Sequence, residues 1–488
     1  MDFVVELSND LNRPAYQRLA EGIRRGILEG RFRPSDRLPP TRSLATTLGL
    51  ARNTILEAYD QLIAEGYLEA RQGSGTFVAA ALPESSLRVG TPSAEGAAGT
   101  RGTPLALSAF GQRALNGEAG ALAREAEAAI PPFNFRYGMP SYEDFPFELW
   151  RQLTKRVLDY PPADVLGYGP AEGLPRLREA IAAYLGRARG VRCTPGQVLI
   201  VSGSQQAVDM AARVLIDPGD TVAIEEPCYP GARAVFHAIG ARLAPVRCDD
   251  EGIVVERIPP ARAIYVTPSH QFPSGVILSA ARRLQLLELA ERQNAVIIED
   301  DYDSEFRYEG HPLGALQGLD RSGRVVYAGT LSKVLLPGLR MGYVVAPRGL
   351  HPAMRATKWL TDRHVPSLYQ AVLSLFIEEG HFERHLRRMR KMYDRRRKAL
   401  LSALAEEFGG RARVSGTESG MHVMVTLDGV RDARAFVRAA RGAGVGLYSA
   451  NTYFTGEPPS EATFMFGYSN MNEERIREGV RRLARAEG

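Results

Sequence analysis

Apolar side chains recur at helical spacing through the N-terminal part of the chain. Leu19, Ile23 and Ile27 repeat every four residues, which predicts a first helix beginning near residue 16. Residues 38–45 open a second helix, with Pro just before its start, and Gly49 ends it. A third helix is predicted from 52 to about 64, because its apolar side chains share one face; these are Ile55, Tyr59, Leu62 and Ile63.

Two short segments that alternate apolar and polar residues follow the third predicted helix. Residues 67–71 and 76–78 are typical of strands, and the Gly-rich segment 72–75 between them is typical of a turn. Three helices followed by a two-stranded wing predict a winged helix-turn-helix domain over residues 1–79.

The hydrophobic pattern is lost over residues 80–131. Gly, Ala, Ser, Pro and Glu dominate this segment, and Phe110 is its only aromatic residue. Because such a composition buries too little apolar surface to offset the entropy of ordering, we predict a flexible linker, with a short helix at about 105–115.

The pattern changes again from residue 132 to residue 488, where apolar strands alternate with helical segments. Continuous Val- and Ile-rich runs separated by helices predict an α/β domain with a mainly parallel sheet covered on both faces. The predicted strands are 198–201, 222–225, 263–267, 295–299, 325–328 and 343–346, and two of the predicted helices are 205–215 and 280–292.

The third predicted helix carries the residues best suited to contact DNA. In a helix-turn-helix, the N-terminal end of the recognition helix enters the major groove. Arg52 and Asn53 can bind guanine and adenine through paired hydrogen bonds, and Thr54 can contact a thymine methyl group or a phosphate. Arg42 and the Gly73-Ser74 turn are further candidates. The alternative is that these are ordinary solvated residues at helix ends.

Charge and cysteine content narrow the possible classes of protein. The net charge is +5, which permits a polyanionic partner, yet the first 80 residues contain no Lys and balance ten Arg against ten acids. DNA affinity there must come from Arg side chains placed on one face. Three unpaired cysteines, an acidic N-terminus and no stretch of about 20 apolar residues predict a cytoplasmic protein outside the membrane.

Lys333 is the strongest candidate for covalent chemistry. It follows the predicted strand 325–328, lies next to Thr330 and Ser332, and precedes Arg340. A lysine amine can attack an aldehyde to form a Schiff base, while the hydroxyls and the guanidinium can hold a phosphate. A lone lysine in a loop is usually only solvated, so the flanking residues carry this interpretation.

Three other segments have side chains that suit the same site. Asp300 and Asp301 end a predicted strand, where a buried carboxylate can keep a pyridine nitrogen protonated. A metal site or a strand-end turn is the alternative, and the absence of a neighbouring His in the sequence speaks against a metal. Residues 202–206 join a strand to a helix and offer backbone N–H groups to an anion. Tyr229 can stack on a flat ring.

The N-terminal unit resembles the GntR family of bacterial regulators over residues 12–79. The matching stretches are 38–45, 52–54 and 65–78, the last of which includes Gly73-Ser74-Gly75-Thr76-Phe77-Val78. The resemblance implies that Arg42, Arg52 and Gly73 contact DNA. Ala51 departs from it, because the family usually has a Ser or Thr that caps the recognition helix, and a missing cap costs about 1 kcal/mol.

Residues 133–488 resemble the fold-type I enzymes that use pyridoxal 5′-phosphate (PLP), the aspartate aminotransferase class. The resemblance implies that Lys333 forms the Schiff base, that Asp300 pairs with the pyridine nitrogen, and that Tyr302 pairs with the ring hydroxyl. It also implies that Tyr229 stacks on the ring. The residues implied to hold the phosphate are Ser204, Gln205, Thr330, Ser332 and Arg340.

The same resemblance implies a dimer. Gly167-Tyr168-Gly169 matches the segment whose tyrosine reaches the phosphate bound by the neighbouring subunit. It also implies a large subdomain over about 160–375 and a smaller α+β subdomain formed by 132–159 and 376–488.

A GntR-type domain joined by a long linker to an aminotransferase-like domain resembles the MocR subfamily over nearly the whole chain. Residues 269–275 and 299–306 also look like that subfamily. Two positions depart from the aminotransferases. Phe272 stands where many of them have an Asn, and Met465 stands where they have the Arg that clamps the substrate carboxylate, so we expect ordinary α-amino acids to be poor ligands.

These observations predict a PLP-dependent transcription regulator rather than an enzyme. We expect a domain-swapped homodimer that binds double-stranded DNA with repeated half-sites, senses PLP itself or a small amine through Lys333, and holds no metal. The alternative is an active aminotransferase with an attached regulatory DNA-binding domain. The basic stretch 384–398 is interpreted as a solvated helix, a subunit contact or a second DNA surface.

Overall fold

The computed structural model describes Val5 and residues 13–71, 73–82, 105–126, 130–310 and 314–486. The chain divides into two compact units, Met1–Ala106 and Leu107–Gly488. No helix in the described ranges is both long and apolar enough to cross a membrane. The linker prediction for residues 83–104 lies outside the described residues.

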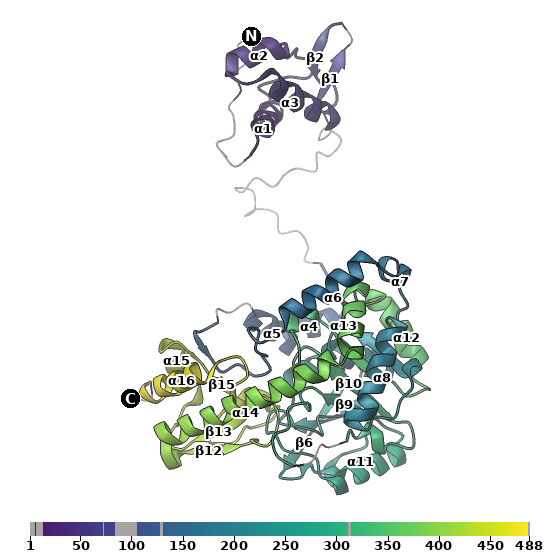
Figure 1. Cartoon of the computed structure of the whole chain (residues 1–488), viewed down its shortest axis with the longest axis vertical. Coiled ribbons are helices and arrows are strands. Elements are labelled where there is room, and N and C mark those ends of the chain that lie inside the picture. Colours follow the sequence, from purple (N-terminus) through teal and green to yellow (C-terminus); the bar gives the residue numbers. More distant parts are fainter. Residues whose placement is uncertain are drawn as a thin grey trace. The chain divides into compact units, whose positions relative to one another are not determined.

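The first unit is a three-helix core followed by a two-stranded antiparallel wing (Figure 1). Leu19 and Ile23 pack with Ile55 and Leu62 in one buried cluster, which is what their helical spacing predicts. Gly49 ends the second helix in a left-handed conformation, with φ of 63°. The elements are α1 (Ala15–Leu28), α2 (Thr41–Leu48), α3 (Arg52–Ala64), β1 (Leu68–Arg71) and β2 (Gly75–Val78).

The second unit is built around an eight-stranded sheet. Strands β6, β5, β8, β9 and β10 run parallel, whereas β11 is antiparallel to both β10 and β4, and β7 is antiparallel to β6. The mainly parallel sheet predicted from the Val and Ile runs is therefore confirmed. In sheet order the strands are β4 (Val198–Val201), β11 (Gly342–Val345), β10 (Val325–Thr330), β9 (Val296–Asp301), β8 (Ala263–Val266), β5 (Thr221–Glu226), β6 (Arg242–Asp249) and β7 (Gly252–Ile253).

Helices cover both faces of this sheet, because successive strand residues point to opposite sides. On β4, Leu199 and Val201 face α9 and α10, whereas Val198 and Ile200 face the cluster that includes α8 and α13. The helices of this unit that precede the smaller sheet are α6 (Phe147–Asp159), α7 (Ala163–Leu166), α8 (Pro175–Arg189), α9 (Ser204–Leu215), α10 (Pro230–Ile239), α11 (Ala280–Gln293), α12 (His351–Asp362), α13 (Ser367–Glu378) and α14 (His381–Phe408).

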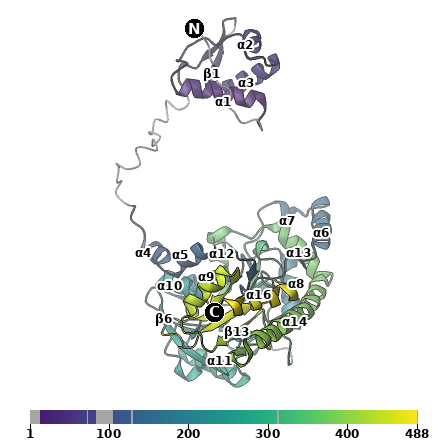
Figure 2. The same cartoon turned by 90° about the vertical axis from the view of Figure 1, so that its left-hand side faces the viewer.

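A smaller four-stranded antiparallel sheet in order β12-β13-β16-β15 accompanies two C-terminal helices. The long helix α14 packs against α16 beside it (Figure 2). Helix α6 packs on α13, so residues 147–159, which we predicted to belong to the smaller subdomain, contact the larger one. The elements are β3 (Phe133–Asn134), β12 (Ala412–Ser415), β13 (His422–Leu427), α15 (Ala433–Gly442), β14 (Val445–Gly446), β15 (Tyr448–Ser449), β16 (Thr463–Gly467) and α16 (Glu473–Arg485).

Two short helices lie within the segment predicted as a flexible linker. These are α4 (Ala109–Asn116) and α5 (Glu118–Ala126), and both pack against α10. Polar contacts attach them, since Arg113 donates to the carbonyl oxygens of Ala238 and Ile239 at 3.0 Å each. The short helix predicted at about 105–115 corresponds to α4, but the prediction of a flexible linker was wrong for 109–126, because composition does not reveal contacts to a helix that lies more than 100 residues later.

Candidate cofactor and DNA-binding sites

The N-terminal end of α3 presents the predicted DNA-contacting side chains to solvent. Arg52 and Asn53 are exposed and Thr54 is half-buried, while Ile55 behind them is fully buried. Ala51 occupies the N-cap position and supplies no side-chain cap, as its apolar side chain requires. The Tyr59 hydroxyl donates to the Pro39 carbonyl at 2.9 Å and so connects α3 to the segment before α2. Arg42, the second residue of α2, is exposed.

The wing turn exposes Gly73 and Ser74. Gly73 has φ of +74°, and a side chain there would meet no atom within 4 Å, so the tip is free to approach a partner. Two arginines that were not predicted flank this wing. Arg37 lies beside Gly75, and the Arg71 guanidinium carbon lies 4.7 Å from the centre of the Phe77 ring. Their cationic groups add to the candidate DNA surface.

Lys333 lies in the loop after β10 and is half-buried. Its Nζ atom is 5.9 Å from the centre of the Tyr137 ring, and a side chain at Gly138 would come within 2.5 Å of that Nζ. Burial lowers the pKa of Lys333, and the nearby Arg136 and Arg340 act in the same direction. A larger fraction of the amine is therefore neutral and able to attack a carbonyl group than for an exposed lysine.

Asp300 and Asp301 have different environments because adjacent strand residues point to opposite faces. Asp300 Oδ2 accepts from the Tyr265 hydroxyl at 2.8 Å, while its buried Oδ1 has no hydrogen-bond partner. Burial raises the pKa of Asp300 to about 6. Asp301 instead pairs with Arg189 at 2.9 Å and accepts from the Tyr327 hydroxyl at 2.6 Å. This divergence argues against a metal held jointly by the two carboxylates.

The turn from β4 into α9 forms an anion cradle. Gly203 is the N-cap of α9 with φ of +85°, and the Arg340 guanidinium lies beside it and donates to the Ser202 carbonyl at 2.8 Å. Ser204 begins α9, so its backbone N–H has no helical acceptor. The Gln205 side chain donates to the Gly231 carbonyl at 2.8 Å, which leaves chiefly its backbone N–H for a ligand.

Two predicted hydroxyls lie close to Lys333 in the loop after β10. The Thr330 hydroxyl accepts from the Ser332 backbone N–H at 3.2 Å, and both residues are buried. The Ser332 Oγ atom is buried without a hydrogen-bond partner. This hydroxyl is therefore available to donate a hydrogen bond to a ligand.

Tyr229 and Phe272 form an aromatic wall. Their ring centres are 5.5 Å apart in an edge-on arrangement, and Phe272 is buried. Phe272 cannot donate a hydrogen bond, so the side chain at this position contributes only shape. Burial raises the pKa of the Tyr229 phenol to about 12, which keeps its ring neutral.

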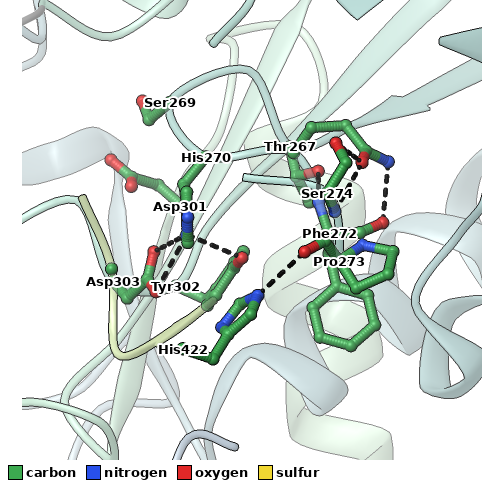
Figure 3. A network of polar contacts seen from close by, with 12 residues as sticks. Thr267, Ser269, His270, Phe272, Pro273, Ser274, Asp301, Tyr302, Asp303 and His422 are labelled. Carbon is green, nitrogen blue, oxygen red and sulfur yellow. Dashed lines mark hydrogen bonds and ion pairs between the residues drawn. The ribbon is translucent and has the colours of Figure 1, made fainter. Parts of the chain in front are cut away.

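Tyr302 belongs to a buried network that sequence reasoning did not assign (Figure 3). Its hydroxyl lies 3.0 Å from His270 Nδ1, which also lies 3.0 Å and 3.1 Å from the two carboxylate oxygens of Asp303. His422 lies beside His270, with ring centres 5.0 Å apart, and its Nε2 lies 3.0 Å from the Pro273 carbonyl oxygen. The histidines thus lie beside Asp303, whereas the described partners of Asp300 and Asp301 are Tyr265, Arg189 and Tyr327.

Hydrogen bonds account for most of this network. One ligand atom from each of His270, Asp303 and His422 lies within 4.8 Å of the other two, as three metal ligands could. Nδ1 of His270 and Nε2 of His422 have protein partners, whereas Nε2 of His270 is buried with no hydrogen-bond partner in the described part of the chain. Asp303 orients His270, and an N–H at Nδ1 can donate to the Tyr302 oxygen, which directs the Tyr302 hydroxyl proton elsewhere. The sequence signal for this network was the motif at residues 269–275, which contains His270, but the motif did not indicate a role for this residue.

Met465 lies close to residues that were predicted to hold the cofactor. It is fully buried on β16 in an apolar cluster with Phe272, Met424, Ala450 and Tyr453, against which Tyr229 and Tyr302 also pack. The position at which aminotransferases have their carboxylate-binding Arg is thus part of a hydrophobic surface that adjoins the cofactor residues.

Tyr168 lies apart from the other predicted cofactor residues of its own chain. It is 84% exposed, and the Arg363 guanidinium carbon lies 4.8 Å from its ring centre. An exposed tyrosine of this kind is available to a neighbouring subunit.

The basic stretch 384–398 lies on α14 and is partly internal. Arg396 and Arg397 are buried and pair with Asp144 and Glu309, each at 3.1 Å. Arg390 donates to the Glu305 carbonyl at 2.7 Å. The interpretation of this stretch as a solvated helix therefore holds for only part of it, because these three arginines join α14 to other segments.

Comparisons with known proteins match both units. The model of bacterial regulatory proteins of the gntR family matches residues 15–78, and that of aminotransferases class I and II matches 133–483. A probable rhizopine catabolism regulatory protein MocR of Rhizobium meliloti is 39% identical over 483 residues, which cover 98% of this chain and 95% of that protein. The HTH-type transcriptional regulator TauR of Rhodobacter capsulatus is 35% identical and covers 96% of each chain.

Solved structures match the second unit. A Pyrococcus horikoshii kynurenine aminotransferase in complex with PMP is 31% identical with a TM-score of 0.69, and the match covers 78% of this chain and 95% of that one. The α-aminoadipate aminotransferase LysN of Thermus thermophilus is 30% identical with a TM-score of 0.70, covering 78% and 96%. The chain therefore belongs to the MocR subfamily of GntR-type transcriptional regulators, in which a winged helix precedes an aminotransferase-like domain.

Proposed function

We propose that this chain is a transcription regulator that binds PLP covalently at Lys333 and responds to PLP or to a small amine by changing how it binds DNA. One contrast carries this proposal. Among the residues suited to hold the cofactor, Asp300 and Ser332 each have a buried atom with no hydrogen-bond partner in the part of the chain that the structure describes, whereas the predicted substrate-clamp position is Met465 in an apolar cluster.

Each end of PLP has suitable residues. The cradle at Gly203 with Arg340 and Ser332 would hold the phosphate, and Asp300 Oδ1 would accept from the ring nitrogen. When bound, PLP supplies an aldehyde that condenses with primary amines and a ring that withdraws electrons. Above pH 6 the Asp300 carboxylate is mostly ionised and favours a protonated ring nitrogen. Tyr302, oriented by His270, would donate to the ring hydroxyl.

The DNA-binding and oligomeric parts of the proposal rest on exposed residues. Arg52, Asn53 and Arg42 would contact a half-site, with Gly73 and Ser74 at the wing. We infer a domain-swapped homodimer in which Tyr168 completes the neighbouring cofactor site, because this side chain is 84% exposed and its ring lies near Arg363 and His364. Two DNA-binding domains would then bind repeated half-sites.

The direct test is binding of the full chain to the DNA upstream of its own gene and of any divergent neighbour, with and without PLP. We expect the affinity, the preferred half-site spacing or the DNA bending to change on PLP or amine addition. No change in any of the three would contradict the proposal.

An active aminotransferase is the second candidate, and the intact pair of Lys333 and Asp300 favours it. Sustained turnover of an amino donor with a keto-acid acceptor would establish it. Met465 argues against this outcome, because a bidentate Arg–carboxylate contact orients the amino acid for proton removal in such enzymes.

A further inference from the structure

A pocket of about 650 Å³ lies between α5, α15 and the segment that contains Tyr137. Its described lining includes five arginines and a single acid, Glu118; the arginines are Arg136, Arg233, Arg434, Arg438 and Arg441. Such a volume suits a small molecule, and the surplus of positive charge favours an anionic one. Tyr137 also lies beside Lys333, so the pocket adjoins the proposed cofactor site.

Glu118 already behaves as an anion bound in this pocket. Its carboxylate accepts from Arg233 Nε at 3.1 Å and also pairs with Arg233 Nη2. Arg233 is only 3% exposed and is fixed by further donation to the carbonyl oxygens of Tyr453 and Thr452, at 2.8 Å and 2.9 Å. The guanidinium is therefore a preorganised carboxylate receptor, and the carboxylate that fills it comes from the first residue of α5.

Polar contacts hold α4 and α5 on α10. Helix α4 has no buried residue, and none of the described side chains of α5 is buried. The Arg233–Glu118 pair and the Arg113 hydrogen bonds are thus major attachments of the two helices. Loss of one such attachment would strongly shift the equilibrium toward undocked α5, because little buried apolar surface holds the two helices on α10.

Arg434 and Arg438 line the same pocket from α15, one helical turn apart. Both are exposed, and among the described residues neither forms an ion pair. Arg136 lines it from the segment after β3 and is half-buried. An incoming anion would therefore find cationic groups beside Arg233 that Glu118 does not use.

We propose that this pocket binds a small carboxylate-bearing ligand that replaces Glu118 on Arg233 and thereby releases α5 from α10. Helices α4 and α5 are the first elements after the segment that joins the two units in the sequence. Release of α5 would thus connect ligand binding to the DNA-binding unit. That consequence rests on the proposed function, whereas ligand binding and the release itself do not.

The test uses the full, PLP-loaded chain and glutarate, which resembles the Glu118 side chain and carries no amine. Hydrogen exchange is followed in peptides of α4 and α5 as glutarate is added at constant ionic strength, with neutral glutaramide as the matched additive. We expect glutarate, and not glutaramide, to speed exchange in these peptides by about tenfold. Unchanged exchange at saturating glutarate would overturn the proposal.

Two variants make the test specific. Glu118→Gln should speed exchange in α4 and α5 without any ligand and bind glutarate about five- to tenfold more tightly, because no internal carboxylate competes. Glu148→Gln is the control, since Glu148 is also an acid in the first turn of a helix and pairs with Arg151. If both variants behave like the unmodified chain, Glu118 does not hold α5.

The double substitution Arg434→Gln with Arg438→Gln leaves the Arg233–Glu118 pair in place. It should weaken glutarate binding by about tenfold while exchange without glutarate stays unchanged. Undiminished binding would place the anion elsewhere. None of these readouts requires DNA binding or imine chemistry, so failure here leaves the proposed function standing, and loss of the proposed function leaves these results interpretable.

Discussion

At the phosphate end of the candidate cofactor site, Gly203, Ser332 and Arg340 keep an anion-binding arrangement, and Ser332 has a buried atom with no protein partner. At the opposite end, Met465 and Phe272 pack into an apolar cluster, so the predicted clamp position itself supplies no cation for a carboxylate. The two ends come from different sheets, since Met465 lies on β16 of the smaller sheet and Gly203 and Ser332 follow strands of the larger one. Their difference suggests that binding of the cofactor has been retained while orientation of an amino acid substrate has not.

The largest effect is expected at Lys333. Lys333→Ala removes the amine that we propose to bond the cofactor, so covalent PLP should be lost completely. Borohydride reduction followed by mass measurement of the intact chain checks this. Lys155→Ala, an exposed position on α6, is the control and should retain the added mass. Retention by the Lys333 variant would show that another lysine bonds the cofactor.

Substitution of the adjacent carboxylates Asp300 and Asp301 should have different effects, one on PLP affinity and the other on stability. Asp300→Asn removes the acceptor for the ring nitrogen and should weaken PLP binding by about 100-fold with little change in stability. Asp301→Asn leaves the buried Arg189 without its charge partner and should cost about 3–5 kcal/mol of folding free energy. PLP titration and urea unfolding of both variants separate the two roles. Equal PLP affinities would refute the assignment of Asp300.

A cation introduced at position 465 should increase reactivity with amino acids and so test the contrast between the two ends of the site. Met465→Arg places a guanidinium where the carboxylate clamp would lie, and reactivity with L-alanine should rise by about tenfold or more. Met465→Leu is the matched control for altered packing. Because a buried Arg is costly, urea unfolding must first show that the variant folds. Equal rates for the two variants would mean that Met465 is not what limits reactivity.

A smaller effect is expected at His270. His270→Asn removes the group that orients the Tyr302 hydroxyl, and PLP affinity should fall by about fivefold while covalent attachment remains. In the Tyr302→Phe background the same substitution should have no further effect on PLP affinity. An additive loss in the double variant would show that His270 acts independently of Tyr302.

The smallest effect concerns the DNA-binding unit. Ala51→Ser supplies the missing cap of α3 and should stabilise this helix by about 1 kcal/mol, with a severalfold gain in DNA affinity. Ala64→Ser, at the exposed far end of the same helix, is the control. Thermal unfolding and DNA titration measure both. A loss of affinity on Ala51→Ser would indicate that DNA approaches too closely for a side chain there.

Sequence reasoning succeeded where the signal is local. The central strands follow from their Val and Ile runs, and 198–201 coincides with β4. The short helix predicted at about 105–115 corresponds to α4, whereas α5 and the packing of both helices on α10 were missed, because Arg113 and Glu118 bind α10 residues 115 or more positions later. The pairing of His270 with His422 was missed for the same reason, since tertiary folding brings together β13 and the loop after β8.

The central claim is that the site holds PLP but handles α-amino acids poorly. Mixing the PLP-loaded full chain with L-alanine or L-glutamate in single-turnover experiments, and following the absorbance of the bound cofactor, tests it most directly. The account predicts conversion that is slow or absent even at high amino acid concentration. Rapid and complete conversion to the amine form of the cofactor would contradict it and would identify the chain as a competent aminotransferase.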